Sequence, residues 1–221
     1  MDEFFIRKAT LNDVPFLVET IIEAEKSGTD KLSYSTVFDL SLEEVRKYLA
    51  DMFNEEVDGC ELSVSSFLVA ELDGQVAAAA SAWIEGSEGI SSSILKGNLL
   101  SYILPKKCIQ KATSLNPVIR DLHIEYTPDS IQVGSAYVSE TFRGKNLCGL
   151  LISKQLKFLS QIRPDISKVF AQLFECNLPS IRMCEKLGFK TVMKIESANE
   201  EVLHYLPFNK KILMTKELFI K

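Results

Sequence analysis

The chain has 221 residues, of which 46% are hydrophobic and 25% are charged, as in an ordinary soluble globular protein. Its net charge of −5 gives no support to nucleic-acid binding, and no apolar run approaches the ~20 residues of a membrane span. Five scattered cysteines without a CxxC pair, two histidines and an N-terminus without a signal-peptide pattern predict a cytoplasmic protein with no bound metal.

The first part of the chain predicts a strand, two helices and a hairpin, in that order. Both helices have apolar residues at helical spacing, and each follows a threonine or serine with an acid three residues later, which is typical of a capped helix start. Asp73 and Gly74 separate two apolar runs and indicate a tight turn. The expected elements are a strand at 4–8, helices at 14–26 and 41–52, and strands at 67–71 and 75–85.

Residues 86–130 have the least regular pattern and are expected to be an insertion. Glycines and serines at their start favour a loop. A helix is expected at 94–104, where Pro105 ends it, and 119–126 alternates like a strand. No repeat or low-complexity linker divides the chain, so residues 1–221 are expected to form a single domain.

The C-terminal third alternates strands and helices. Apolar and β-branched runs predict the strands, and apolar residues at helical spacing predict the longer helix. Gly188 ends the shorter helix. The expected elements are strands at 131–138, 168–174, 191–195 and 210–218, and helices at 150–162 and 180–187. Interleaving of this kind favours helices packed on a central sheet.

Residues 143–149, with the sequence Arg-Gly-Lys-Asn-Leu-Cys-Gly, lie between a predicted strand and a predicted helix. A helix start leaves its first N–H groups unpaired and concentrates partial positive charge there. Glycines let the backbone approach an oxyanion, and Arg143 and Lys145 add full charges. The segment therefore suits a phosphate or pyrophosphate, although a simple basic turn has the same pattern. Neither a Walker A loop nor a GxGxxG pattern is present.

A second segment follows the next predicted strand, at residues 177–189. Asn177 ends the strand, Pro179 and Ser180 open a short helix, and Gly188 closes it. On its own this pattern describes an ordinary capped helix. The order and spacing of the two segments together are a more specific indication of function than either segment alone.

Together these segments resemble the GCN5-related N-acetyltransferase (GNAT) family. Residues 138–151 look like its acetyl-CoA motif, Arg/Gln-x-x-Gly-x-Gly/Ala, and 177–189 look like the motif that follows it. Residues 6–13 and 212–218 resemble the family's first and last strands, while 86–130 lie outside the resemblance. The resemblance implies an α+β fold, an α/β/α sandwich in which helices flank a mixed, strongly bent sheet of about six to seven strands.

The resemblance also implies a role for each motif residue. Two neighbouring strands that end near Val138 and Phe174 would splay apart to admit the pantetheine arm of acetyl-CoA. Backbone groups of Val138 and Ser139 would hold that arm and the thioester carbonyl, and Asn177 would contact the pantetheine. The remaining cofactor-binding residues, at the pyrophosphate, would be Arg143, Gly144, Lys145, Asn146, Leu147, Cys148 and Gly149.

Three positions depart from the family pattern. Asn146 and Cys148 stand where the family has its two motif glycines. Asparagine tolerates unusual backbone conformations, and a helical position for Cys148 needs no glycine. The family often has a tyrosine five residues before the closing Phe189, as a general acid toward the departing thiolate, and this chain has Cys184 there. A cysteine thiol can donate a proton, although packing in the core is the plainer role for this position.

The implied reaction is direct transfer of an acetyl group from the CoA thioester to a primary amine of a small molecule or peptide. The attacking amine must lose a proton, and Glu85, Glu125 and Glu140 are candidate bases for this step. Tyr137 flanks the thioester site. Each of these residues also suits an ordinary surface or packing position, and the lone His123 is expected to be structural.

The acceptor amine is not identified by the sequence. Glu23, Glu25 and Asp30 form an acidic stretch where a cationic amine would dock, or simply a solvated helix end. The expected partners are acyl-CoA and the amine, without nucleic acid or membrane, and a homodimer is left open. Cys184 keeps a second class of function open, a non-catalytic acyl-CoA-binding or sensing module. A third alternative is a nucleotide-binding module, for which ATP would compete as well as CoA.

Overall fold

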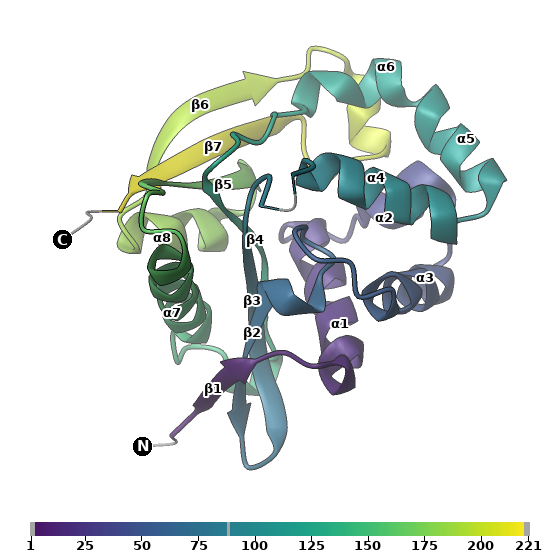
Figure 1. Cartoon of the computed structure of the whole chain (residues 1–221). Coiled ribbons are helices and arrows are strands. Elements are labelled where there is room, and N and C mark those ends of the chain that lie inside the picture. Colours follow the sequence, from purple (N-terminus) through teal and green to yellow (C-terminus); the bar gives the residue numbers. More distant parts are fainter. Residues whose placement is uncertain (1–2, 88, 219–221) are drawn as a thin grey trace.

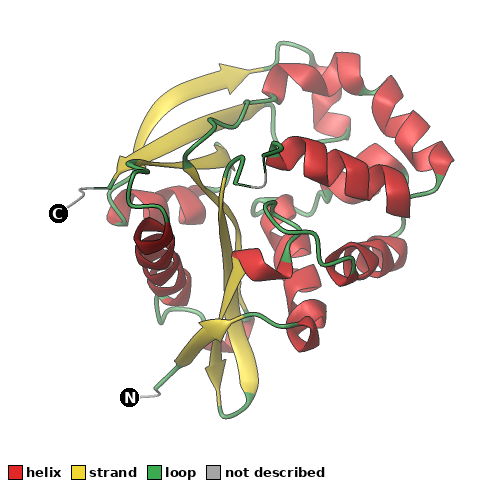
Figure 2. Cartoon of the chain, in the orientation of Figure 1, coloured by secondary structure: helices red, strands yellow, loops and turns green. Residues whose placement is uncertain are grey.

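A computed structural model describes residues 3–87 and 89–218. Seven strands of this described part form one sheet, and helices cover both of its faces (Figures 1 and 2). The strands are β1 Phe5–Lys8, β2 Phe67–Leu72, β3 Gln75–Ile84, β4 Ile131–Val138, β5 Lys168–Phe174, β6 Lys190–Glu196 and β7 Lys210–Glu217. The α-helices are α1 Val14–Lys26, α2 Ser33–Phe38, α3 Leu42–Asn54, α4 Ser92–Ile103, α5 Lys106–Ser114, α6 Asn116–Ile119, α7 Leu147–Ile162 and α8 Leu178–Lys186.

The sheet has the strand order β1-β2-β3-β4-β5-β7-β6. Neighbouring strands are antiparallel except β4 and β5, which are parallel and are joined through α7. In Figure 1, β2, β3 and β4 run lengthwise through the molecule, whereas β6 and β7 arch across one end. The predicted α+β class and the mixed, bent sheet are therefore confirmed.

Several predicted elements agree closely with the structure. The predicted strands 131–138 and 168–174 and the predicted helix 14–26 have the bounds of β4, β5 and α1. The hairpin between β2 and β3 turns at Asp73 and Gly74, whose φ angles are 51° and 81°. Two-residue hairpin turns favour positive φ at their central residues, which explains why this pair was a usable signal.

The prediction of a strand at 119–126 is wrong. This segment contains the end of α6 and a 3-10 helix, and it then continues without regular secondary structure. Its alternation reflects burial, because Leu122 and Ile124 are 2% and 7% exposed. The carbonyl of Ile124 accepts a hydrogen bond from Nε2 of Gln172 at 3.0 Å, so a side chain takes the place of a ladder partner.

The insertion at 86–130 is mostly helical. The helix predicted at 94–104 corresponds to α4, and Pro105 separates it from α5, which was not predicted. The short helices α2 and α6 were not predicted either. Helix α4 packs against α3 and α5 packs against α2, so the insertion extends the helical layer on one side of the sheet.

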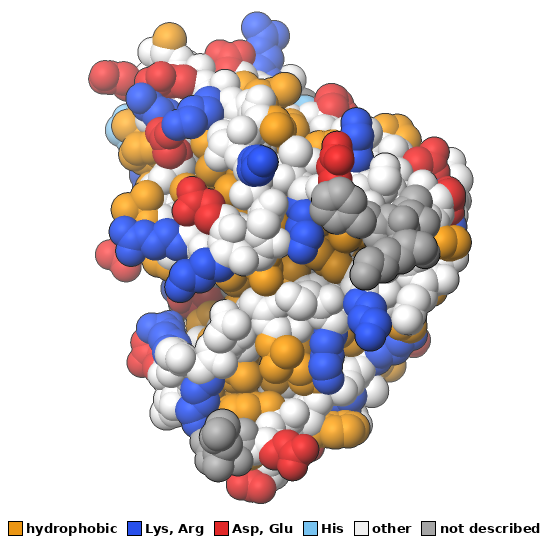
Figure 3. Space-filling model, turned by 90° about the vertical axis from the view of Figure 1, so that its left-hand side faces the viewer, with side chains coloured by type: hydrophobic (Ala, Val, Ile, Leu, Met, Phe, Trp, Pro, Cys, Tyr) orange, Lys and Arg blue, Asp and Glu red, His pale blue; other side chains and the backbone are white. Residues whose placement is uncertain are grey.

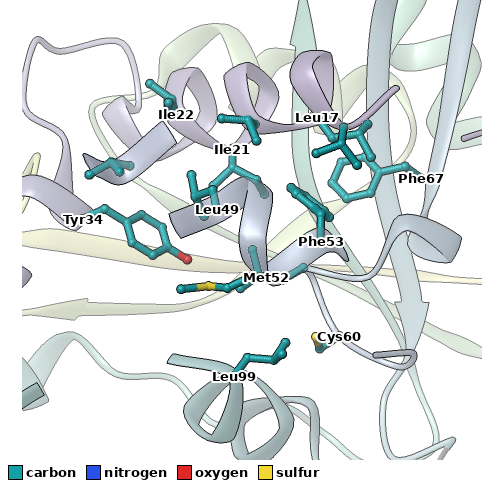
Figure 4. Close-up of a cluster of buried hydrophobic side chains, with 14 of the residues drawn as sticks. Leu17, Ile21, Ile22, Tyr34, Leu49, Met52, Phe53, Cys60, Phe67 and Leu99 are labelled. Atoms are coloured by element: carbon teal, nitrogen blue, oxygen red, sulfur yellow. The ribbon is translucent and has the colours of Figure 1, made fainter. Parts of the chain in front are cut away.

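The two sides of the sheet differ in their packing. On one side, which we call the α1–α4 face, a large hydrophobic cluster fills the space between α1–α4 and the sheet (Figure 4). The rings of Phe53 and Phe67 meet edge to face there, with centroids 5.8 Å apart. On the other side, the α7–α8 face, leucine and isoleucine side chains of α7 pack against the alanines of β3. Among the described helices, none is long and apolar enough to cross a membrane.

Candidate active site

Strands β4 and β5 pair only over a short stretch. Residues 131–133 of β4 face 169–171 of β5 in parallel register. Beyond these pairs, within the described part of the chain, 136–138 of β4 pair only with β3 and 172–174 of β5 only with β7. The predicted divergence of these two strands is therefore present. It leaves main-chain groups of β4 that face β5 without a ladder partner, and such groups require another polar partner.

A β-bulge lies where the strands begin to diverge. One residue of β3, Ser81, lies opposite two residues of β4, Gly134 and Ser135. The Ser81 hydroxyl donates to the carbonyl of Ser135 at 3.3 Å. A Cβ atom on Gly134 would lie 2.5 Å from Oγ of Ser81 and 2.7 Å from Cζ3 of Trp83. Only glycine fits this position, because the Trp83 ring lies directly against β4.

The loop between β4 and α7 has the backbone that a phosphate cradle needs. It contains a short 3-10 helix, and then Gly144 has a φ of 83° and Asn146 a φ of 57°. Glycine adopts this left-handed conformation freely, and asparagine tolerates it better than most residues. Asn146 immediately precedes α7, whose first N–H groups begin at Leu147. Cys148 lies within the helix, so neither departure from the family glycines strains the loop.

The side chain of Asn146 lies over the first turn of α7. A Cβ atom on Gly149 would be 2.7 Å from Oδ1 of Asn146, so Gly149 makes room for this carboxamide. Burial raises the pKa of the neighbouring Cys148 thiol to about 11, so this thiol stays neutral at neutral pH. The start of α7 therefore carries no negative side chain in its first turn.

Two cationic side chains flank the same loop. Nη1 of Arg143 lies 3.4 Å from Oε1 of Glu140, and both side chains are exposed. Nζ of Lys145 lies 5.3 Å from the ring centroid of Phe4 and 5.8 Å from that of Phe142. On this side of the molecule, Lys and Arg side chains surround exposed hydrophobic ones (Figure 3). The surface beside the loop therefore suits an anion that also has apolar parts.

Ser139 and Asn177 lie beside the divergent strands. The N–H of Ser139, directly after β4, donates to the carbonyl of Ala77 at 3.0 Å. Its hydroxyl oxygen is buried and has no hydrogen-bond partner within residues 3–87 and 89–218. Oδ1 of Asn177 accepts from the N–H of Ser180 at 3.3 Å and caps α8. The Ser139 hydroxyl therefore has unused hydrogen-bonding capacity, and Asn177 positions the start of α8 next to β5.

Two candidate proton donors lie on opposite sides of the sheet. Cys184 is 2% exposed and packs between α8 and the sheet, and burial raises the pKa of its thiol to about 11. The ring centroid of Tyr137 lies 5.9 Å from that of Phe16 of α1, on the α1–α4 face. Burial, together with the nearby Glu23, raises the pKa of the Tyr137 phenol, so it keeps its proton at neutral pH.

Glu85 holds the start of α4 against the sheet. It is 2% exposed and accepts from Nε1 of Trp83 at 3.0 Å and from the N–H of Ser92 at 2.9 Å. The Ser92 hydroxyl donates to the same carboxylate. The N–H of Glu85 donates to the carbonyl of Ser130, just before β4 begins. The carboxylate of Glu85, a candidate base from the sequence, therefore already accepts three hydrogen bonds.

The other two candidate carboxylates are exposed, unlike that of Glu85. Glu140 follows the far end of β4, roughly 23 Å along the strand from Ile131. Oε1 of Glu125 lies 3.3 Å from Nε2 of His123, and both side chains are largely exposed. Glu85 and Glu140 therefore lie at opposite ends of β4.

A group of polar residues that no sequence pattern predicts lies on the α1–α4 face. We call it the inner polar cluster. It comes from α1, α2, the loop before β2, α4, the loop before β4, and β7. Its members are Glu25, Tyr34, Glu61, Lys96, Tyr126 and Lys211. Because these residues come from six separate elements, no spacing along the chain relates them.

Of this cluster, only Glu25 is a candidate from the sequence, as part of an acidic stretch. The other residues of that stretch go elsewhere: Glu23 pairs with Lys26 at 2.6 Å, and Asp30 is exposed. One signal for Lys211 was available, because in β7 it alternates with the buried Leu213 on one face of the strand. Among the described residues, no group of three or more His, Cys, Asp or Glu is placed to hold a metal ion.

Comparison with known proteins agrees with this geometry. A sequence model of the acetyltransferase (GNAT) family matches residues 35–189. No curated protein matches the chain in sequence. Solved structures match over nearly the whole chain. An N-acetyltransferase from Staphylococcus aureus Mu50 has a TM-score of 0.66 and 16% identity, over 96% of this chain and 100% of that one.

Two further solved structures show the range of acceptors named for this fold. A polyamine N-acetyltransferase from Drosophila melanogaster has a TM-score of 0.59 and 14% identity, over 98% of this chain and 100% of that one. A ribosomal-protein-alanine N-acetyltransferase from Brucella melitensis has a TM-score of 0.55 and 19% identity, over 97% and 99%. At these identities the likeness establishes the fold, and the acceptors belong to those proteins.

Proposed function

The chain belongs to the acetyltransferase (GNAT) family and is an acetyl-CoA-dependent N-acetyltransferase, and we propose which parts of it hold the two substrates. CoA binds at the β4–α7 loop, on the α7–α8 face. The acceptor amine approaches from the α1–α4 face. The divergence of β4 from β5 is the observation that supports this proposal. Beside the start of α7, where main-chain N–H groups are unpaired, the hydrogen bonds between β4 and β5 are missing, and the two faces of the sheet can communicate.

In this proposal the cofactor is held mainly by the main chain. The N–H groups of residues 145–149 bind the pyrophosphate, and Arg143 and Lys145 add charge. Each amide bond to a charged oxygen contributes ~1.5–3 kcal/mol. Four or five such bonds therefore supply much of the roughly 8 kcal/mol that micromolar affinity requires. The pantetheine arm pairs with the free edge of residues 134–138, and the unpartnered Ser139 hydroxyl and Asn177 lie at its sides.

The reaction is attack of a neutral amine on the thioester carbonyl, with CoA thiolate as the leaving group. A lysine-like amine with a pKa near 10.4 costs about 4–5 kcal/mol to neutralise at pH 7, so the proton leaves through a carboxylate or a chain of water. We assign the return of a proton to the thiolate to Tyr137. It keeps its proton, is only partly buried and belongs to the diverging part of β4. Cys184 is sealed in the core and is assigned to packing.

Calorimetry with acetyl-CoA tests the cofactor site. Arg143→Ala is expected to raise the Kd by about tenfold, the loss of one charged hydrogen bond. Lys157→Ala, an exposed cation near the other end of α7, is the matched control and should leave the Kd unchanged. A structure with acetyl-CoA bound whose pyrophosphate lay away from residues 143–149 would refute the site.

Release of CoA with a panel of primary amines tests the chemistry. Tyr137→Phe is expected to lower kcat by at least about tenfold, because one acid–base group usually contributes more than this to the rate. The Kd for acetyl-CoA should not change. Cys184→Ala should leave kcat nearly unchanged. The burial of Cys184 also favours a second candidate, a non-catalytic acyl-CoA sensor. Tight binding of acetyl-CoA without turnover on any amine would select the sensor.

A further inference from the structure

The inner polar cluster lies between the two flanks of the strand divergence. On one flank, the Tyr126 ring meets Trp83 edge to face at 5.6 Å, and Trp83 lies against Gly134 at the bulge. On the other flank, Nζ of Lys211 lies 5.4 Å from the ring centroid of Phe174, the last residue of β5. The cluster therefore spans the place where, in the proposed function, the thioester would meet the acceptor.

The charges of the cluster balance. Glu25 and Glu61 supply two negative charges, and Lys96 and Lys211 supply two positive ones. Lys96 forms an ion pair with Glu61. Burial works against the charged form of Lys96, but Glu61 and Tyr34 outweigh it and raise its pKa. One acidic and one basic member thus neutralise each other, which leaves Glu25 and Lys211.

The two remaining charged side chains, Glu25 and Lys211, have few polar partners. Oε2 of Glu25 accepts from the Ser33 hydroxyl at 2.8 Å, and Oε1 accepts no hydrogen bond from the described residues. Lys211 is half-buried, and within that same part of the chain its side chain has no ion pair or hydrogen bond, only the ring of Phe174. Burial lowers the pKa of Lys211, and the nearby Glu25 opposes this effect only in part. A buried ammonium in this state gains from an incoming anion.

Tyr34 supplies a second sign of an incompletely satisfied polar group. The residue is 5% exposed, and its hydroxyl oxygen has no partner within hydrogen-bond distance in residues 3–87 and 89–218, although Lys96 lies close enough to act on the phenol. Figure 4 shows this hydroxyl turned inward from α2, toward Met52. Nζ of Lys96 lies 5.5 Å from the Tyr34 ring centroid, so the hydroxyl belongs to the cluster. Buried hydroxyls are normally paired, and an unpaired one calls for a ligand or water.

We propose that the inner polar cluster is the acceptor site and that the acceptor is a zwitterion of the amino-acid class, with a carboxylate beside the amine that is acetylated. Glu25 receives the ammonium, while Lys211 and the Tyr34 hydroxyl provide donors for the carboxylate. Glu25, Lys96 and Lys211 all keep partial exposure, so a soluble molecule reaches them. A polyamine fits less well, because its second cation would meet two lysines. This assignment rests on the proposed acetyl transfer.

Matched pairs of acceptors test the proposal. The pairs are L-phenylalanine with 2-phenylethylamine, L-ornithine with putrescine, and L-arginine with agmatine, each at saturating acetyl-CoA. The carboxylate-bearing member is expected to have the higher kcat/KM by at least about tenfold in one or more pairs, because a site built for a polar group rejects the analogue that lacks it. Preference for the decarboxylated member in every pair that reacts would overturn the proposal that the acceptor is a zwitterion.

Variants of β7 locate the carboxylate contact. Lys211→Met is expected to raise KM for the carboxylate-bearing acceptor by about tenfold or more, the effect of one charged contact, without changing KM for its decarboxylated partner. Lys211→Arg should retain most of the preference. Lys210→Met removes a neighbouring lysine on the other face of β7, which pairs with Glu196 at 3.1 Å, and should change neither value. Equal loss for both acceptors in Lys211→Met would overturn the assignment.

Binding of acetyl-CoA, measured without an acceptor, separates the two levels of failure. Amine acetylation without any preference for carboxylates would overturn the acceptor assignment and leave the proposed transfer intact. Failure to bind acetyl-CoA, or binding without acetylation of any amine in the panel, would overturn the transfer and the acceptor assignment together.

Discussion

The two faces of the sheet offer candidate ligand sites that are built from different parts of the chain. On the α7–α8 face, the candidate cofactor site consists of main-chain N–H groups at the start of α7 and the free edge of β4. On the α1–α4 face, the inner polar cluster consists of side chains from six elements. A main-chain site tolerates changes of side chain, as Asn146 and Cys148 in place of glycine illustrate. A side-chain site does not, so in the proposed function we expect specificity for the acceptor to depend on the α1–α4 face.

The largest expected effect comes from detaching α1. Oδ2 of Asp13 accepts from Nη1 of Arg7 at 2.7 Å and from the N–H of Thr10 at 2.8 Å. Asp13→Asn is expected to lower the free energy of unfolding in urea by ~2–3 kcal/mol, less than the ~3–5 kcal/mol of a fully buried pair because Arg7 keeps Glu71. If the faces act separately, the Kd for acetyl-CoA stays the same, and a large change in that Kd would break the comparison.

The same ion pair makes stability depend on acid. Burial alone would raise the pKa of Asp13, but the bonds from Arg7 and Thr10 outweigh it and hold this pKa below 3.8. The folded state therefore binds the proton less well than the unfolded state. The stabilisation is complete above pH 3.8 and is lost as the pH falls through the lower, folded value. Urea titrations below pH 5 should show this loss in the wild type and not in Asp13→Asn, whereas Asp30→Asn, at an exposed position, should behave as wild type.

A smaller effect is expected at the bulge between the two faces. Gly134→Ala places a Cβ against Ser81 and Trp83, and overpacking of this kind costs ~1–3 kcal/mol. Thermal unfolding measures the loss, and the fluorescence of Trp83, the single tryptophan, reports the displacement of its ring. Gly97→Ala in α4, where a Cβ meets open space, is the control and should stabilise by ~0.5–1 kcal/mol. Equal behaviour of the two variants would argue against a tight bulge.

The smallest effect is expected in the cofactor loop. Gly149→Ala brings a Cβ to 2.7 Å from Oδ1 of Asn146. This side chain is flexible and moves aside, so the free energy of unfolding in urea is expected to fall by only about 1 kcal/mol. Asn146→Gly removes the obstacle and keeps the left-handed backbone. The double variant is therefore expected to recover most of the loss, a coupling of at least about 0.5 kcal/mol. Simple additivity would show that the Asn146 side chain does not lie over α7.

The sequence predicted the parts of the site that depend on neighbouring residues. Residues 143–149 predict a helix start, because the glycine, asparagine and helix-forming residues that mark it are neighbours in the sequence. The family resemblance supplied the divergence of β4 and β5, which the pairing of 131–133 confirms. The missed parts depend on tertiary structure: the 119–126 segment alternates because of burial, and Lys211 meets the other charges only after β7 joins the sheet.

Strands β4 and β5 separate without either strand ending, so the proposed reaction has two entrances. Donor and acceptor reach the thioester from opposite faces, and neither occupies the other's route. Both substrates can therefore be present at once, and initial-rate plots should intersect instead of running parallel. Free CoA and the acetylated amine likewise have separate exits. Added CoA should then compete with acetyl-CoA alone, and the acetylated amine should compete with the acceptor alone.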